Sequence, residues 1–280
     1  IGPYFDGTVT INGGHVKAFA DGKGCGIGGH RGEVTVTITG GTVEAVAANQ
    51  FAAIGGEGSV TITGGVINAA GKNNAAGIGS NGDIRITGGE ITVSAEGLGA
   101  AIGGYAGVDC GNITIQGNVI KSVISSGAGA CIGGASNRSA GSITISNAKL
   151  PPLNGTSLIG WIRGNTAGSL TIRNCYIEST DTAAGSGIQV SDNGNIRIEN
   201  SEVKLPEKRD IRAGDGGSIV IRDSTIHSNG IYMLGNLNEA KNLKRLEITG
   251  STVVTAGNVI GAMGSRASVD EIVIHGSSLS

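Results

Sequence analysis

Two aspartates occupy equivalent places in neighbouring stretches of the sequence. Asp192 lies six residues before Ile198, and Asp215 lies six residues before Ile221. If these stretches stack as neighbouring strands, their backbones are about 4.8 Å apart, and the two carboxylates come close enough to interact. A carboxylate pair about 5–5.5 Å apart is the arrangement that a retaining glycosidase uses. The same pair, together with backbone carbonyls, could hold Ca²⁺.

The residues that follow each aspartate allow a role without chemistry. Asp-Asn-Gly at 192–194 and Asp-Gly-Gly at 215–217 are ordinary turn sequences. Three interpretations of the pair are therefore open: turn formation, which the sequence favours, a weak calcium site, and a catalytic pair.

Larger side chains gather in the same part of the chain. Short runs such as Gly26-Ile27-Gly28-Gly29 recur in the first half, but the corresponding runs later carry Trp161, Arg163, Arg212 and Tyr232. Aromatic and guanidinium groups suit the binding of a sugar, so these four residues are candidate ligand-binding residues beside the aspartates. Simple drift of the repeat is the alternative.

All these residues are carried by one repeat that runs through the chain. An apolar residue stands two positions before and five positions after every anchor, with mostly polar residues between the first two, which is the alternation of a half-buried strand. Glycine, asparagine or aspartate always stands two positions after the anchor, which predicts one left-handed corner residue per coil, such as Gly64. The anchors are eleven isoleucines 23–30 residues apart: Ile11, Ile38, Ile62, Ile86, Ile115, Ile145, Ile172, Ile198, Ile221, Ile248 and Ile274.

The repeat predicts an all-β, right-handed parallel β-helix of about eleven coils, with three short strands in each coil. The Gly-Ile-Gly-Gly runs supply the third strand, and their small residues predict a flat, featureless face. Fifty-two glycines and only 3% aromatic residues suit a narrow core of stacked isoleucine and valine. We expect a single domain over residues 1–280, with regular coils over 1–145 and degenerate coils over 146–280.

The composition excludes several function classes. A formal net charge of −2 gives no field that would attract nucleic acid, and no run of 18 apolar residues predicts membrane insertion. The four cysteines and four histidines show neither metal-ligand spacing nor a Ser–His–Asp arrangement. Arg173, Glu199 and Arg222 each follow an anchor on successive coils, which predicts a ladder of surface ion pairs. No cofactor is expected apart from the weak calcium possibility.

The repeated motifs resemble glycine-rich regions of large secreted or wall-anchored bacterial proteins. Ile-Thr-Gly-Gly at 38–41, 62–65 and 86–89 and the Gly-Ile-Gly-Gly runs carry this resemblance. More broadly, the expected architecture is similar to the pectate-lyase-like superfamily, which includes polysaccharide lyases, glycoside hydrolases, tailspikes, adhesins and carbohydrate-binding domains. The resemblance implies an extracellular or cell-surface location and a glycan-related role.

The sequence is compatible with three functions. The first is a non-catalytic module that acts as a rigid surface scaffold, adhesin or carbohydrate-binding domain, and the sequence favours it. The alternative is a glycan-active enzyme, either a glycoside hydrolase or a polysaccharide lyase, with Asp192 and Asp215 as the catalytic pair. The third is ice binding by the threonine array around Thr37 and Thr61, which Arg85 interrupts. Open coil ends also predict fusion to further domains or end-to-end stacking.

Overall fold

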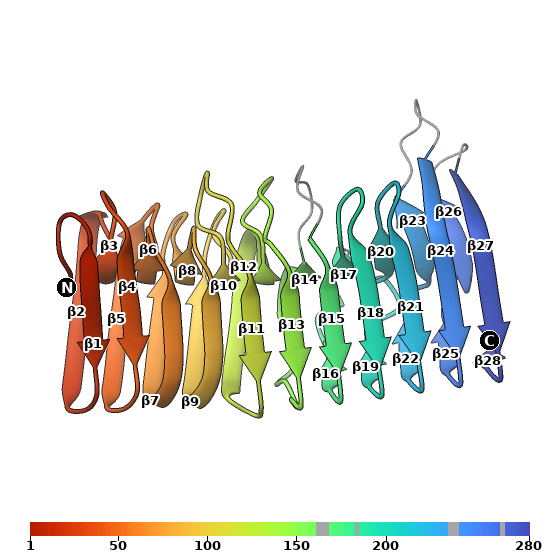
Figure 1. Cartoon of the computed structure of the whole chain (residues 1–280), viewed down its shortest axis with the longest axis horizontal. Helices are drawn as coiled ribbons and strands as arrows, with labels where there is room; N and C mark the ends of the chain where they lie inside the picture. The colour runs from red at the N-terminus through yellow and green to blue at the C-terminus, as the bar shows by residue number, and fades with distance from the viewer. Residues whose placement is uncertain (161–167, 183–184, 235–240, 264–266) are drawn as a thin grey trace.

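The anchor isoleucines form one unbroken column along the molecule. In the computed structural model each anchor is paired in parallel register with the anchor of the next coil, from Ile11↔Ile38 to Ile248↔Ile274. Figure 1 shows the result as a long stack of coils, with the two termini at opposite ends. The structure describes residues 1–160, 168–182, 185–234, 241–263 and 267–280.

Each coil contributes to three faces of a prism. We call the first the anchor face, because it contains the anchor column and the apolar column two residues before it. Both columns point into the core, and residues such as Val36 and Ile38 are fully buried. The strands of the anchor face are β1 (Gly7–Ile11), β4 (Val34–Ile38), β7 (Val60–Gly71), β9 (Ile84–Ala95), β11 (Ile113–Gln116), β13 (Ile143–Ser146), β15 (Leu170–Arg173), β18 (Asn195–Glu199), β21 (Ser218–Arg222), β24 (Lys241–Thr249) and β27 (Ala267–His275).

The middle face follows the corner and carries the apolar column five residues after the anchors. β7 and β9 run through the corner into this face, with shifts of register between Ile62 and Val66. From the seventh coil onward, whose anchor is Ile172, the middle face is a separate sheet of five strands. Besides β7 and β9, the strands of the middle face are β2 (His15–Lys23), β5 (Thr42–Asn49), β12 (Ile120–Gly133), β16 (Tyr176–Glu178), β19 (Glu202–Lys204), β22 (Thr225–Ser228), β25 (Thr252–Thr255) and β28 (Ser278–Leu279).

The glycine face contains the Gly-Ile-Gly-Gly runs and their later replacements. Its isoleucines point inward, and Ile54, Ile78, Ile102 and Ile132 are fully buried. β12 also reaches this face. The remaining strands are β3 (Ile27–Gly29), β6 (Ala52–Gly56), β8 (Ala76–Ser80), β10 (Ile102–Gly103), β14 (Asn154–Gly160), β17 (Ser186–Gln189), β20 (Ile211–Ala213), β23 (Ile231–Leu234) and β26 (Ile260–Met263).

The corner after the anchor face has two forms, and the predicted position is wrong for one of them. In the first four coils the left-handed residue is the second glycine of the pair, as in Gly65 with φ 92°, and not Gly64. In later coils the predicted residue itself adopts a positive φ, as in Asn147 with φ 52°. Gly64 is restricted for a different reason: a Cβ there would lie 2.2 Å from the Thr39 carbonyl oxygen.

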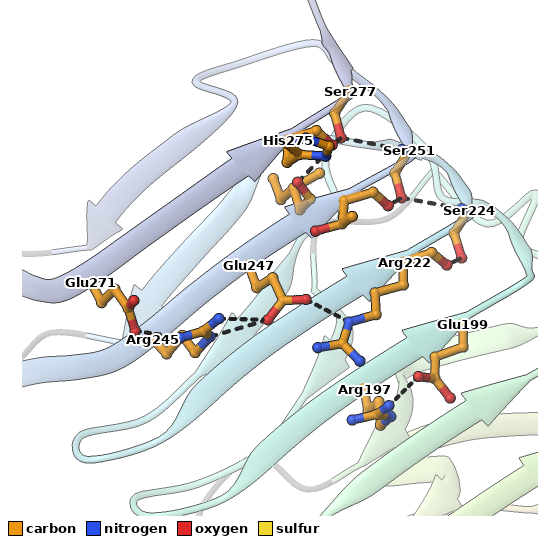
Figure 2. A network of polar contacts seen from close by, with 12 residues as sticks. Arg197, Glu199, Arg222, Ser224, Arg245, Glu247, Ser251, Glu271, His275 and Ser277 are labelled. Carbon is orange, nitrogen blue, oxygen red and sulfur yellow. Dashed lines mark hydrogen bonds and ion pairs between the residues drawn. The ribbon is translucent and has the colours of Figure 1, made fainter.

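Side-chain ladders stabilise the corners that lack the glycine pair. The Asn174 amide donates to Asn147 Oδ1 and the Asn200 amide donates to Asn174 Oδ1, both at 2.8 Å. In the last four coils a serine follows the left-handed corner residue, and these serines form a column: Ser201, Ser224, Ser251 and Ser277. Ser224 Oγ accepts the N–H of Ser201 and donates to the Arg222 carbonyl, and Ser251 and Ser277 repeat this pattern in Figure 2. In the degenerate half, asparagine and serine side chains therefore form hydrogen bonds between coils at the corner where the first coils have a pair of glycines.

In the part of the chain that the structure describes, no helix is long and apolar enough to cross a membrane.

Candidate functional site

The two predicted aspartates lie in the loops that precede β18 and β21, on neighbouring coils as expected. Asp192 Oδ1 accepts the backbone N–H of Asp215 at 2.9 Å, and Asp215 Oδ1 accepts the N–H of Asn242 at 2.6 Å. Lys241 Nζ donates to Asp192 Oδ2 at 2.7 Å. Each carboxylate thus binds the backbone of the following coil, and these contacts are those of turn-forming residues.

The same contact recurs elsewhere in the chain. Asp83 Oδ1 accepts the N–H of Asn112, and Asn112 Oδ1 accepts the N–H of Ser142, at 2.8 and 2.9 Å. The uncharged side-chain amide of Asn112 therefore accepts a backbone N–H of the next coil just as the carboxylate of Asp83 does. Within the described residues no group of three or more His, Cys, Asp or Glu side chains could hold a metal ion. A calcium site at Asp192 and Asp215 would depend on backbone oxygens, and this possibility stays a prediction.

The predicted ligand-binding residues are only partly assembled. Arg212 and Tyr232 are register partners on β20 and β23, so they lie on neighbouring coils. Arg212 forms an ion pair with Asp210, whose side chain is only 3% exposed. Burial raises the pKa of Asp210, although the adjacent guanidinium acts in the opposite direction. Trp161 and Arg163 lie outside the described residues.

A buried arginine that the sequence did not indicate lies beside this pair. Arg209 is fully buried, and its guanidinium donates to the carbonyl oxygens of Gly155, Thr156 and Ser186 at 2.6, 3.0 and 3.2 Å. It also pairs with Asp181 at 3.0 Å. Burial lowers the pKa of Arg209. The run 207–210 contains four charged residues after a proline, which looks like an exposed turn. Other coils carry small residues in the column that contains Arg209. A large charged residue in that column is the signal that could have identified the buried arginine.

The predicted ion-pair ladder is only partly present, because Arg173 pairs with Glu199 but Arg222 pairs with Glu247 instead (Figure 2). Glu199 pairs with both Arg173 and Arg197. On the next coils, Glu247 binds Arg222 and Arg245, and Arg245 continues to Glu271. The Glu247 side chain is only 6% exposed. Hydrogen bonds from Arg222 and Arg245 lower its pKa to about 2, so the carboxylate is held ionised between two guanidinium groups.

This network predicts a pH dependence of stability. Because the pKa of Glu247 falls from its ordinary value of 4.5 to about 2 on folding, its stabilisation is complete above pH 4.5 and is lost as the pH falls toward 2. Urea unfolding at several pH values measures it: wild type should lose more stability over this range than Glu247→Gln does. Glu271→Gln, at the exposed end of the network, is the matched control and should keep the wild-type slope. Parallel curves for wild type and Glu247→Gln would contradict the assignment.

The cysteines do not form a reactive group. All four are free, and three of them are buried. Burial raises the pKa of Cys25 to about 11 and that of Cys131 to about 12, which disfavours the thiolate that a metal site or a nucleophile needs.

A shallow groove crosses the outer side of the middle face. It has a volume of about 350 Å³ and is lined by Asn118, Lys121, Lys149, Pro151 and Tyr176, among others. Lys149 and Lys204 place their ammonium groups 5.3 and 5.2 Å from the Tyr176 ring centroid. The Tyr176 hydroxyl donates to Glu178 at 2.9 Å. The ring is thus engaged by neighbouring side chains of its own chain.

The parallel coils, the three faces and the buried apolar columns define a parallel β-solenoid. The sequence model of the right-handed β-helix region matches residues 106–278, more than half of the chain, so the protein belongs to this family. Comparison with curated proteins and with solved structures found no match. The fold supports a structural or glycan-related module.

Proposed function

We propose that this chain is a non-catalytic extracellular module: a rigid surface scaffold that binds carbohydrate on its outer faces, as an adhesin or a carbohydrate-binding domain does. The proposal includes a cell-surface or secreted location, a glycan partner and no required cofactor. It also includes fusion to further domains or end-to-end stacking of coils.

The observation that carries this proposal is the set of contacts made by the candidate catalytic pair. Asp192 and Asp215 each use one carboxylate oxygen to bind the backbone N–H of the next coil. A nucleophile or general acid needs an oxygen directed at the substrate, whereas these oxygens hold neighbouring loops together. The long columns of buried isoleucine and the hydrogen bonds between coils support the rigid scaffold.

The glycan-active enzyme stays the alternative, because the Asp192 side chain is 52% exposed and could reach a substrate. Under this alternative, Asp192 and Asp215 act as the catalytic pair, with Arg212, Tyr232, Trp161 and Arg163 as ligand-binding residues.

A polysaccharide panel tests the proposal, with binding and product release measured on the same samples. Wild type should bind without releasing product, and the double variant Asp192→Asn/Asp215→Asn should bind equally well. Asparagine keeps the oxygen that accepts the backbone N–H, as Asn112 does, so this variant should fold. Product that appears with wild type and disappears with the double variant would establish the enzyme and overturn the proposal.

A further inference from the structure

Aromatic side chains are rare in this protein, yet half of them form one row. The chain has one Trp, four Tyr and three Phe. Phe5, Tyr4, Phe51 and Tyr105, with the ring of His30 between Tyr4 and Phe51, follow one another at centroid distances of 5.0, 5.8, 5.2 and 5.5 Å. We call these five residues the aromatic row.

The row lies on the first coils, beside the strands of the glycine face. His30 follows β3, Phe51 precedes β6, and Tyr105 follows β10. Tyr105 is 3% exposed and packs with Ala52, Ala76 and Phe51 as a small apolar cluster, separate from the main core. This end of the row is therefore fixed in place. The expectation of a featureless glycine face is wrong here, because its outer side carries this cluster.

The other end of the row is open to solvent. Tyr4 is 54% exposed and Phe5 is 67% exposed, and their rings meet edge to face at 87°. Large exposed rings on a fixed apolar base are typical of a binding surface rather than of a core. The guanidinium of Arg31 lies 5.3 Å from the Tyr4 ring centroid. Among the described residues, no carboxylate lies within 4 Å of Arg31 in an ion pair.

We propose that the aromatic row is a binding site for an acidic polysaccharide. The C–H faces of a pyranose ring would pack on Tyr4 and Phe5, and a sugar carboxylate would pair with the Arg31 guanidinium. The positive charge of Arg31 favours an acidic sugar over a neutral one. Because no carboxylate in the described part of the chain lies within ion-pair distance of Arg31, it can bind a sugar carboxylate without breaking an ion pair inside the protein. This inference rests on the proposed carbohydrate-binding function and places the site on the first coils, far from Asp192 and Asp215.

The test measures binding of the full chain to alginate, a polymer of uronic acids, and to dextran, a neutral polymer. Tyr4→Ser/Phe5→Ser should weaken binding to alginate by about tenfold or more, since aromatic anchors carry a large share of binding energy. Arg31→Gln should remove the preference for alginate over dextran. Phe19→Ser is the matched control, because Phe19 is 70% exposed on β2 and outside the row, so its binding should equal that of wild type. Circular dichroism verifies that all variants fold.

Each other outcome has a defined meaning. Wild-type binding that Tyr4→Ser/Phe5→Ser does not change would overturn the row as the site but keep the proposed function. No binding of either polymer by wild type would overturn both this site and the carbohydrate-binding part of the proposed function. Equal binding of both polymers, unchanged by Arg31→Gln, would overturn the acidic preference. A dimer in sedimentation that Tyr4→Ser/Phe5→Ser dissolves would show that a second copy occupies the row instead.

Discussion

Replacing Arg209 by methionine should lower the free energy of unfolding by about 3–5 kcal/mol, as is typical when one partner of a buried ion pair is removed. The guanidinium is fully buried and spans three coils, from Gly155 and Thr156 through Asp181 and Ser186. Methionine fills part of the space but leaves four carbonyl oxygens, among them that of Asp181, and one carboxylate without this donor. Chemical denaturation followed by circular dichroism measures the loss.

Arg138→Met is the control for this prediction, since Arg138 is exposed. It should change the free energy of unfolding by less than about 0.5 kcal/mol. Arg209→Lys should lie between the two, because lysine keeps the charge but cannot reproduce the planar fork. Equal unfolding midpoints for Arg209→Met and Arg138→Met would show that the guanidinium contributes no net stability.

Gly133→Ala should also be severely destabilising, by about 4 kcal/mol, because two effects act together. The backbone at Gly133 has φ 144°, which L side chains rarely adopt, and a Cβ would lie 1.8 Å from the carbonyl oxygen of Gly160 on the next coil. The coils cannot separate locally without breaking the hydrogen bonds between β12 and β14. Thermal unfolding and amide exchange of the neighbouring coils are the measurements.

Two glycines separate these effects. Gly117 has φ 82° and no atom within 4 Å of the position that a Cβ would occupy, so Gly117→Ala isolates the backbone strain and should cost about 1–2 kcal/mol. Gly13 has neither a positive φ nor a neighbour within 4 Å, so Gly13→Ala should be close to neutral. If all three variants melt at the same temperature, close approach between coils does not explain the glycine face.

The sequence predicts the register of this fold well because the apolar columns are long and mutually consistent. All eleven anchors pair in the predicted order, since a shift of one residue would expose a whole column. The corner after the anchor face is less predictable. Where two glycines are adjacent, as at Gly64 and Gly65, both tolerate positive φ, and the sequence alone does not indicate which of the two adopts it.

The candidate site is less predictable than the fold, for physical reasons. Equal spacing from the anchors placed Asp192 and Asp215 on neighbouring coils, but it could not show that backbone N–H groups occupy their oxygens. The burial of Arg209 depends on carbonyl groups 53 and 54 residues earlier in the chain, which no local pattern reveals. The residues of the aromatic row stand at different offsets from the anchors, from six before Ile11 for Phe5 to eleven before Ile62 for Phe51, so no anchor column reveals the row.

The parallel pairing of successive coils has a mechanical consequence. The hydrogen bonds between coils point along the long axis of the molecule, and the two termini lie at its opposite ends (Figure 1). A force applied at these two ends therefore loads the coils in series. A detached coil of about 26 residues extends to roughly 90 Å, against the 4.8 Å or so that it occupied in the stack. Such a chain would lengthen in discrete steps under tension, while bending of the intact stack is resisted by all three faces at once.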